Sequence, residues 1–245
     1  MWQDVLKLRD WYKTPTGRMV VRVVRAALLP KIPEKAEVLC VGFTIPYLKS
    51  HASNSQLKVA MPAQMGAIHW PFEGANRCVL SSHHALPFAD ESFDYIVLTH
   101  ALEFSADTAA LLREVWRVLR PTGKVLVMVP NRMSPWSRVS LPLSPFAQGH
   151  PYAGPELSRL LKHHHFMPLN TSYSLFTPPS QKRFVLKLAP TFERYGQRFM
   201  PLVGGVLMME AKKDTQAMRA QRTGAKARTD FVSVPAYSLR NRLDI

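Results

Sequence analysis

The sequence predicts an α/β domain built on a mostly parallel sheet, and residues 85–132 carry most of that prediction. Residues 95–99 and 124–130 are continuous apolar runs, which is typical of strands covered by helices on both faces. Between them, one apolar helix face is formed by Leu111, Leu112, Val115, Val118 and Leu119. A buried strand, an amphipathic helix and a second buried strand together form a right-handed crossover in a parallel sheet.

The remaining apolar runs predict the other elements. We expect strands over residues 37–41, 56–61, 77–80 and 166–177, and an antiparallel last strand over residues 206–211. Helices are expected over residues 2–12, 16–29, 155–164 and, as one or two helices, 181–200. Ser105 or Asp107 caps the helix that follows the fourth strand. The strands at 37–41 and 95–99 are predicted to be parallel neighbours.

Composition bounds the class of protein. The chain has 245 residues, is 47% hydrophobic and carries a formal net charge of +15, which favours contact with nucleic acid or acidic membranes and equally fits a basic protein without such a partner. Cys40 and Cys78 lack metal-like spacing and are expected to be reduced thiols, so we expect a cytoplasmic protein. Arg22 and Arg25 interrupt the longest apolar run, so no transmembrane segment is expected. His163, His164 and His165 are adjacent at the end of an expected helix and point in different directions, so no metal site is expected.

Two stretches of the central unit resemble a known family. Residues 86–103, LPFADESFDYIVLTHALE, and residues 112–131, LREVWRVLRPTGKVLVMVPN, are similar to the fourth and fifth strands of small class I S-adenosylmethionine-dependent methyltransferases. The resemblance covers about residues 38–166. It implies a Rossmann-like, seven-stranded, mostly parallel sheet with helices on both faces. It also implies S-adenosylmethionine as the cofactor and methyl transfer as the reaction.

The cofactor motif of that family is degenerate in this chain. After the first strand the family has an acid followed by three alternating glycines, which let the backbone approach the methionine part of the cofactor. Here Cys40 stands at the acid, Gly42 is kept, and Thr44 and Pro46 replace the later glycines. The resemblance makes Gly42, Phe43 and Thr44 the cofactor-binding residues of this loop.

Further cofactor positions follow the second and third strands. Met61 stands where the family has an acid that holds the ribose hydroxyls, and Ser82 stands where an Asp or Asn contacts adenine. His83 would present its backbone N–H to the adenine edge. Losing the ribose acid removes a charged hydrogen bond, so we expect weak cofactor binding.

His100 follows the fourth strand, at the edge where parallel sheets bind ligands. Its position makes it a candidate general base and a cofactor contact, and a structural histidine is an equally good interpretation. In the resemblance Glu103 is kept and Phe104 replaces a histidine. Methyl transfer needs mainly alignment of the nucleophile and the methyl group, so a conspicuous catalytic residue is not required.

The acceptor pocket is expected after the fifth strand. Asn131 ends that strand, and residues 133–152 are rich in Pro and Ser, as in a substrate-facing loop. His150 and Tyr152 lie where the family lines its acceptor pocket.

The sequence divides into a methyltransferase-like domain over residues 1–211, which includes N-terminal helices over residues 1–33, and a basic tail over residues 212–245 that is predicted to be disordered. The leading function is methyl transfer to an unidentified small-molecule acceptor. A catalytically silent binding or scaffold protein is the alternative, supported by Cys40, Thr44 and Met61. A nucleic-acid methyltransferase is a third, supported by charge alone. The tail itself is a candidate arm for nucleic acid or an anionic surface.

Overall fold

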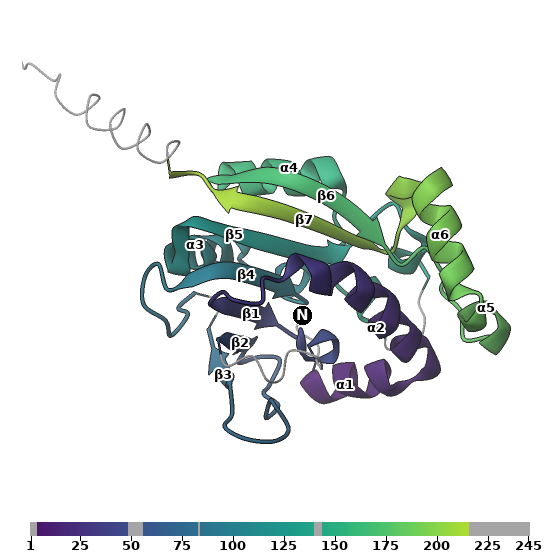
Figure 1. Ribbon diagram of the computed structural model, residues 1–245, viewed down its shortest axis with the longest axis horizontal. Helices are drawn as coiled ribbons and strands as arrows, with labels where there is room; N and C mark the ends of the chain where they lie inside the picture. The colour runs from purple at the N-terminus through teal and green to yellow at the C-terminus, as the bar shows by residue number, and fades with distance from the viewer. Residues whose placement is uncertain (1–3, 49–55, 83, 140–143, 216–245) are drawn as a thin grey trace, which may run out of the picture.

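The computed structural model describes residues 4–48, 56–82, 84–139 and 144–215. Within them one sheet contains β1 (Val38–Gly42), β2 (Leu57–Pro62), β3 (Cys78–Ser81), β4 (Phe93–Thr99), β5 (Leu119–Pro130), β6 (Phe166–Ser174) and β7 (Val206–Lys213). The strand order is β3-β2-β1-β4-β5-β7-β6 (Figure 1). β1 and β4 are parallel neighbours, and β7 runs antiparallel to β5 and β6. The predicted fold class and strand arrangement are confirmed.

Helices cover both faces of the sheet (Figure 1). α1 (Val5–Lys13) and α2 (Pro15–Leu28) pack with Cys40 and Val97 on one face. α3 (Thr108–Val118) and α4 (Gly154–His163) pack with Leu39, Ile96 and their neighbours on the other. Because alternate strand residues enter two separate cores, the strands read as continuous apolar runs.

Two short helices, α5 (Arg183–Lys187) and α6 (Ala189–Phe199), lie beside α2 at one end of the molecule (Figure 1). Their positions confirm the expectation of one or two helices over this segment. None of the helices that the structure describes has the length and apolarity needed to cross a membrane.

Three element ends are settled by particular contacts. The Asp107 carboxylate accepts a hydrogen bond from Ala110 N–H at 2.8 Å, so Asp107 rather than Ser105 caps α3. β5 begins earlier than expected, because Leu119 already pairs with Phe93 of β4. β7 continues to Lys213, past the predicted start of the tail, because Lys212 pairs with Lys124 of β5 and Lys213 pairs with Phe166 of β6. The buried Lys213 Nζ also donates to Leu119 O at 2.7 Å. The rest of the predicted tail, residues 216–245, lies outside the described residues.

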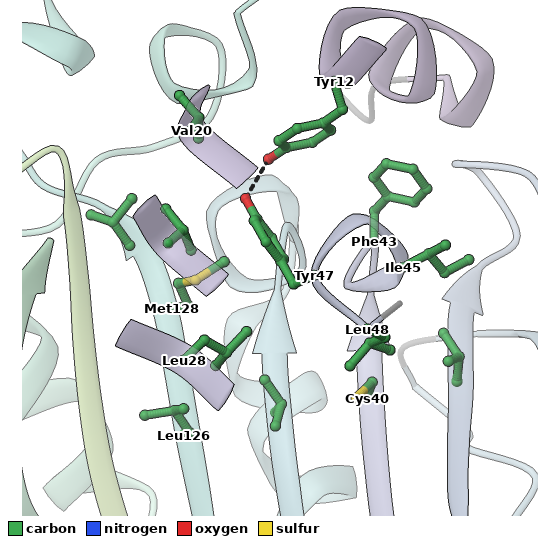
Figure 2. Packing of buried hydrophobic residues seen from close by; sticks show 14 of the residues in the cluster. Tyr12, Val20, Leu28, Cys40, Phe43, Ile45, Tyr47, Leu48, Leu126 and Met128 are labelled. Carbon is green, nitrogen blue, oxygen red and sulfur yellow. Dashed lines mark hydrogen bonds between the residues drawn. The ribbon is translucent and has the colours of Figure 1, made fainter. Parts of the chain in front are cut away.

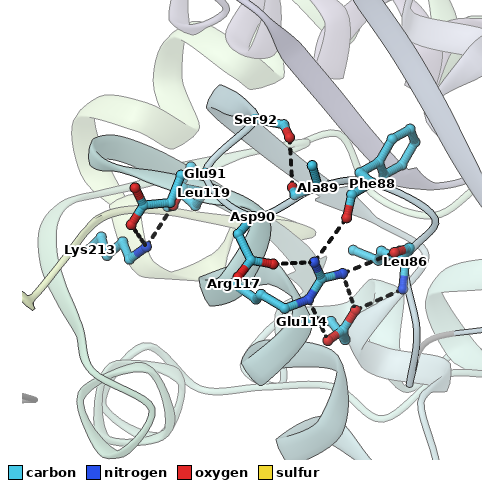
Figure 3. A network of polar contacts seen from close by, with 10 residues as sticks. All are labelled: Leu86, Phe88, Ala89, Asp90, Glu91, Ser92, Glu114, Arg117, Leu119 and Lys213. Atoms are coloured by element: carbon cyan, nitrogen blue, oxygen red, sulfur yellow. Dashed lines mark hydrogen bonds and ion pairs between the residues drawn. The ribbon is translucent and has the colours of Figure 1, made fainter.

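A polar network ties the loop before β4 to α3 (Figure 3). Arg117 forms two hydrogen bonds to the Glu114 carboxylate, and its guanidinium also donates to Phe88 O, Leu86 O and Asp90 Oδ1. Glu114 in turn accepts from Leu86 N–H at 2.8 Å. The network fixes the loop that connects β3 to β4.

Candidate functional site

The turn after β1 brings the ends of β1 and β4 into close contact. Gly42 has φ +90°, and a Cβ atom there would lie 2.1 Å from Thr99 O. Only glycine fits this position, because both the backbone conformation and the close approach exclude a side chain. A short 3-10 turn, Ile45–Tyr47, follows it and carries Tyr47 into the protein interior.

Four buried side chains form a hydrogen-bonded chain above this turn, which we call the buried relay: Tyr47, Tyr12, His100 and Glu103. Tyr12 Oη lies 2.7 Å from Tyr47 Oη and 2.6 Å from His100 Nε2. His100 Nδ1 lies 3.0 Å from Glu103 Oε1. Figure 2 shows Tyr12 reaching from α1 toward Tyr47. An ionised Glu103 accepts from Nδ1–H, which leaves Nε2 to accept the Tyr12 proton.

Burial controls the chemistry of the relay. Removal from water, followed by the influence of Tyr47, raises the pKa of Tyr12 well above its ordinary value, so its phenol stays protonated as a donor. Phe146 packs edge-on against the His100 ring, with ring centres 5.8 Å apart, and shields it from solvent. Within the part of the chain that the structure describes, Glu103 Oε2 has no hydrogen-bond partner. The buried relay therefore contains one carboxylate oxygen, Glu103 Oε2, that is available to accept a further hydrogen bond.

A cavity of about 1240 Å³ lies beside the relay. We call it the cationic cavity. One wall comes from α1, α2 and the residue after α2, with the side chains Arg9, Tyr12, Lys13, Arg18, Val21, Arg22, Arg25, Ala26 and Leu29. The opposite wall is apolar and comes from the loops after β1 and β2, chiefly Phe43, Ile45, Ile68, Trp70 and Phe72. Tyr12 belongs both to this cavity and to the relay.

The described charged side chains of the cavity wall are all positive. Among the described residues that line it, five are Arg or Lys and none is Asp or Glu. Arg9 and Lys13 each pair with Asp10, at 3.2 and 3.4 Å. Among the described residues, no acidic side chain forms an ion pair with Arg18, Arg22 or Arg25. The cavity is therefore suited to a ligand with an acidic head and an apolar body.

The structure distributes the predicted cofactor residues over several environments. Phe43 lines the cavity, whereas Thr44 and Met61 are fully buried and lie outside its wall. Gly42 is buried against β4, and His100 belongs to the relay. Ser82 is exposed after β3, and His83 lies outside the described residues. An aspartate at position 61 would place its carboxylate in an apolar core.

The predicted acceptor residues have other contacts. Asn131 Nδ2 donates to Leu202 O and Gly204 O, both at 2.8 Å, and fixes the chain before β7. His150 is half exposed, with Nε2 3.6 Å from Glu156 Oε1. Tyr152 is buried, and burial raises its pKa to about 12. None of the three lines the cationic cavity.

The sequence did not predict the role of Tyr47. It also did not predict that α1 and α2 face the loops after β1 and β2 across a cavity. The stripe of Arg18, Arg22 and Arg25 is readable from helical spacing, and the structure places all three on the cavity wall. Tyr47 gives no local signal, because its partner Tyr12 is 35 residues away.

Comparisons with known proteins agree with this fold. Residues 40–127 match the family model described as a methyltransferase domain. An uncharacterised Mycobacterium tuberculosis protein is 27% identical over 227 residues, covering 86% of this chain and 75% of that protein. Malonyl-[acyl-carrier protein] O-methyltransferase of Halorhodospira halophila is 42% identical over 50 residues, covering 20% of this chain and 17% of the enzyme.

Solved structures give the same result at lower sequence identity. A Thermotoga maritima structure described as a SAM-dependent methyltransferase and possible histamine N-methyltransferase has a TM-score of 0.59, with 15% identity over 85% of this chain and 95% of that one. A SAM-dependent methyltransferase of Aquifex aeolicus has a TM-score of 0.53, with 13% identity over 85% of this chain and 97% of that one. These structural likenesses establish the fold.

Proposed function

We propose that this chain is a class I S-adenosylmethionine-dependent methyltransferase, as the match of residues 40–127 to a methyltransferase-domain model supports, and that it methylates a small acceptor held in the cationic cavity. The observation that carries the proposal is the place of this cavity. It opens beside Phe43 and Ile45, directly after β1, in a sheet of order β3-β2-β1-β4-β5-β7-β6. Open α/β sheets bind ligands outside the carboxyl ends of their strands, near the point where the strand order reverses.

The cavity suits S-adenosylmethionine in size, and its lining suits the adenine and methionine parts of the cofactor but not the ribose. Its volume of about 1240 Å³ exceeds the roughly 300–1,000 Å³ of ordinary ligand pockets, so it has room for a cofactor and an acceptor. Trp70 and Ile68 form an apolar surface against which adenine can pack, and the cations of α1 and α2 can pair with the methionine carboxylate. None of the described lining residues is an acid, so this part of the chain offers no carboxylate to the ribose hydroxyls. When bound, the cofactor supplies an electrophilic methyl group on a sulfonium.

The acceptor that suits the remaining surface is an amphipathic acid. Arg18, Arg22 and Arg25 are free of acidic partners among the described residues and present guanidinium groups from one side. Phe43, Ile45 and Phe72 present apolar surface from the other. A carboxylate or phosphate on an apolar body would satisfy both walls at once.

The relay gives the reaction a route for a proton. His100 Nε2 is the acceptor of the Tyr12 hydrogen bond, and Tyr12 lines the cavity. We propose that an acceptor hydroxyl loses its proton toward His100 through Tyr12, while Glu103 stabilises the protonated imidazole. An acceptor that is already anionic needs no such transfer, and the relay then acts only by fixing the position of Tyr12.

One observation favours a second function. The buried Met61 and the absence of an acid from the cavity wall weaken the cofactor site, so the same cavity suits a binding protein that carries an amphipathic acid without methylating it. The two functions differ in whether methyl transfer occurs. Nucleic-acid methylation lacks a comparable structural observation.

The test is transfer of a labelled methyl group from S-adenosylmethionine to a panel of long-chain and aromatic carboxylic acids and phenols. We expect labelled product with at least one amphipathic acid. Arg22→Glu with Arg25→Glu should raise the KM for that acceptor at least tenfold, because it reverses two cavity charges, about 1.4 kcal/mol or more. Arg113→Glu with Arg159→Glu is the matched control, because both residues are exposed on α3 and α4. Acid binding without any labelled product would favour the carrier function.

A further inference from the structure

A second surface, formed by α5, α6 and the residues that follow them, exposes several large apolar side chains. Six large apolar side chains in and around α5 and α6 are between 45% and 66% exposed. We call this surface the α6 patch: Phe184, Leu188, Tyr195, Phe199, Met200 and Leu202. Several large apolar side chains exposed within one short stretch of a folded protein indicate an interaction surface.

Helical spacing explains why the patch faces outward. Leu188, the residue before α6, and Tyr195 and Phe199 within it lie at intervals of seven and four residues, and the Tyr195 and Phe199 rings stack. Other residues of α6 fix it to the protein. A Cβ at Gly196 would lie 2.3 Å from Phe176, and Glu193 accepts from Leu175 N–H and Thr177 N–H at 3.0 Å each. The apolar stripe therefore cannot turn inward without breaking these contacts.

Cations surround the patch. Residues 181–203 contain Lys182, Arg183, Lys187, Arg194 and Arg198. Their single acid, Glu193, is turned toward the protein and occupied by backbone donors. Arg198 also lies over the Phe199 ring, 5.8 Å from its centre, so charge and apolar surface meet in one place.

We propose that the α6 patch docks this protein onto the surface of an anionic lipid bilayer. Exposed Phe, Leu and Met with flanking Lys and Arg are the composition of helices that lie in the membrane interface. The aliphatic members argue against a nucleic-acid surface, because Leu188, Met200 and Leu202 offer no ring for base stacking. Anionic headgroups complement the flanking cations, and the acyl boundary complements the apolar side chains.

A groove between α2 and α6 adjoins the cationic cavity. Arg22 and Ala26 of α2 line that cavity, and they also line a groove whose other wall contains Ala189 and Pro190 of α6. Figure 1 shows α5 and α6 beside α2. A bilayer bound at α6 would therefore lie close to α2. The docking proposal stands on the patch itself and does not require methyl transfer.

Sedimentation of the full chain with vesicles tests the proposal. We expect binding to vesicles that contain equal amounts of phosphatidylglycerol and phosphatidylcholine, little binding to phosphatidylcholine alone, and weaker binding as salt increases. Phe199→Ser with Leu202→Ser should lower the vesicle affinity at least tenfold. Leu80→Ser is the matched control, because Leu80 is 49% exposed on β3, at the other edge of the sheet.

The charge contribution is tested separately. Arg194→Glu with Arg198→Glu should also lower the affinity at least tenfold, whereas Arg113→Glu with Arg159→Glu should lower it less than threefold. Thermal unfolding must show that every variant is folded. The proposal is overturned if the wild type ignores anionic vesicles, or if both α6 variants bind them as the wild type does. It is equally overturned if the patch variants abolish only self-association or RNA binding.

Discussion

Tyr12 joins three segments that are far apart in the sequence. It belongs to α1, and its phenol meets Tyr47 after β1 and His100 after β4. All three side chains are buried. Removing the phenol oxygen would leave two buried polar partners unpaired, each at a cost of about 1–3 kcal/mol. A single side chain therefore couples the N-terminal helix to the ligand-binding edge of the sheet.

The raised pKa of Tyr12 makes its contribution depend on pH. Burial keeps the phenol neutral in the folded protein, whereas in the unfolded chain it ionises near its ordinary value of 10.0. Stability from a group with a raised folded pKa is present below the unfolded pKa and is lost as pH rises above it. Tyr12→Phe should therefore lower the free energy of unfolding at pH 8. The difference in free energy of unfolding between the wild type and this variant should be smaller by about 1.4 kcal/mol at pH 11.

Urea unfolding of both proteins at pH 8 and pH 11 measures this gap. The exposed Tyr195→Phe serves as control, because Tyr195 is 58% exposed and outside the relay. A gap for Tyr12→Phe that stays constant between the two pH values would show that the phenol is not held neutral by the fold.

Residue-level prediction from sequence succeeds where the signal is local. The position of His100 at the end of an apolar run predicts that it follows a strand of the parallel sheet, and the structure places it directly after β4. The contacts of Met61 and Asn131 were not predictable in this way. Met61 is buried by α1, α2 and their loops, and Asn131 is bound by carbonyls about 70 residues later. Such contacts depend on the assembled chain.

At the level of elements, α3 and the loop before β4 depend on one arginine. Arg117 donates to both oxygens of Glu114 and to the carbonyls of Phe88 and Leu86 (Figure 3). Its side chain is 32% exposed, so solvent screening reduces the contribution of its ion pairs to stability. The two carbonyl contacts remain, because they satisfy backbone groups of the loop.

We expect Arg117→Met to lower the free energy of unfolding by about 2 kcal/mol. Amide exchange at Leu86 should also become faster, because Glu114 accepts from its N–H. Arg113→Met, an exposed change in the same helix, should stay within about 0.5 kcal/mol of wild type. Equal effects of the two substitutions would contradict a specific anchoring role for Arg117.

Element positions followed from periodicity more closely than element ends did. The apolar face of α3 and the buried strands were predicted because each core face repeats along the chain. The early start of β5 and the extension of β7 to Lys213 were not, since both depend on pairing with distant partners, Phe93 for β5 and Phe166 for β7. The long apolar wall of the cavity likewise comes from loops without a repeating pattern.

Across the whole molecule, two groups of cations contribute to the net charge of +15. Arg18, Arg22 and Arg25 face the cationic cavity, while Arg194 and Arg198 flank the α6 patch. The first set suits an acidic ligand inside the protein, and the second suits an anionic surface outside it. The two sets can be reversed independently, since they lie on different helices.

The central claim is that S-adenosylmethionine binds in the cationic cavity, and calorimetric titration of the full chain tests it most directly. We expect one site per chain for S-adenosylmethionine and for S-adenosylhomocysteine, with a dissociation constant on the order of 10⁻⁴ M, because the ribose lacks an acid. Ala26→Trp should weaken binding at least tenfold by filling the cavity, whereas Ala89→Trp, in an exposed loop, should not. Absence of binding at millimolar ligand, or unchanged affinity in a folded Ala26→Trp variant, would contradict the claim.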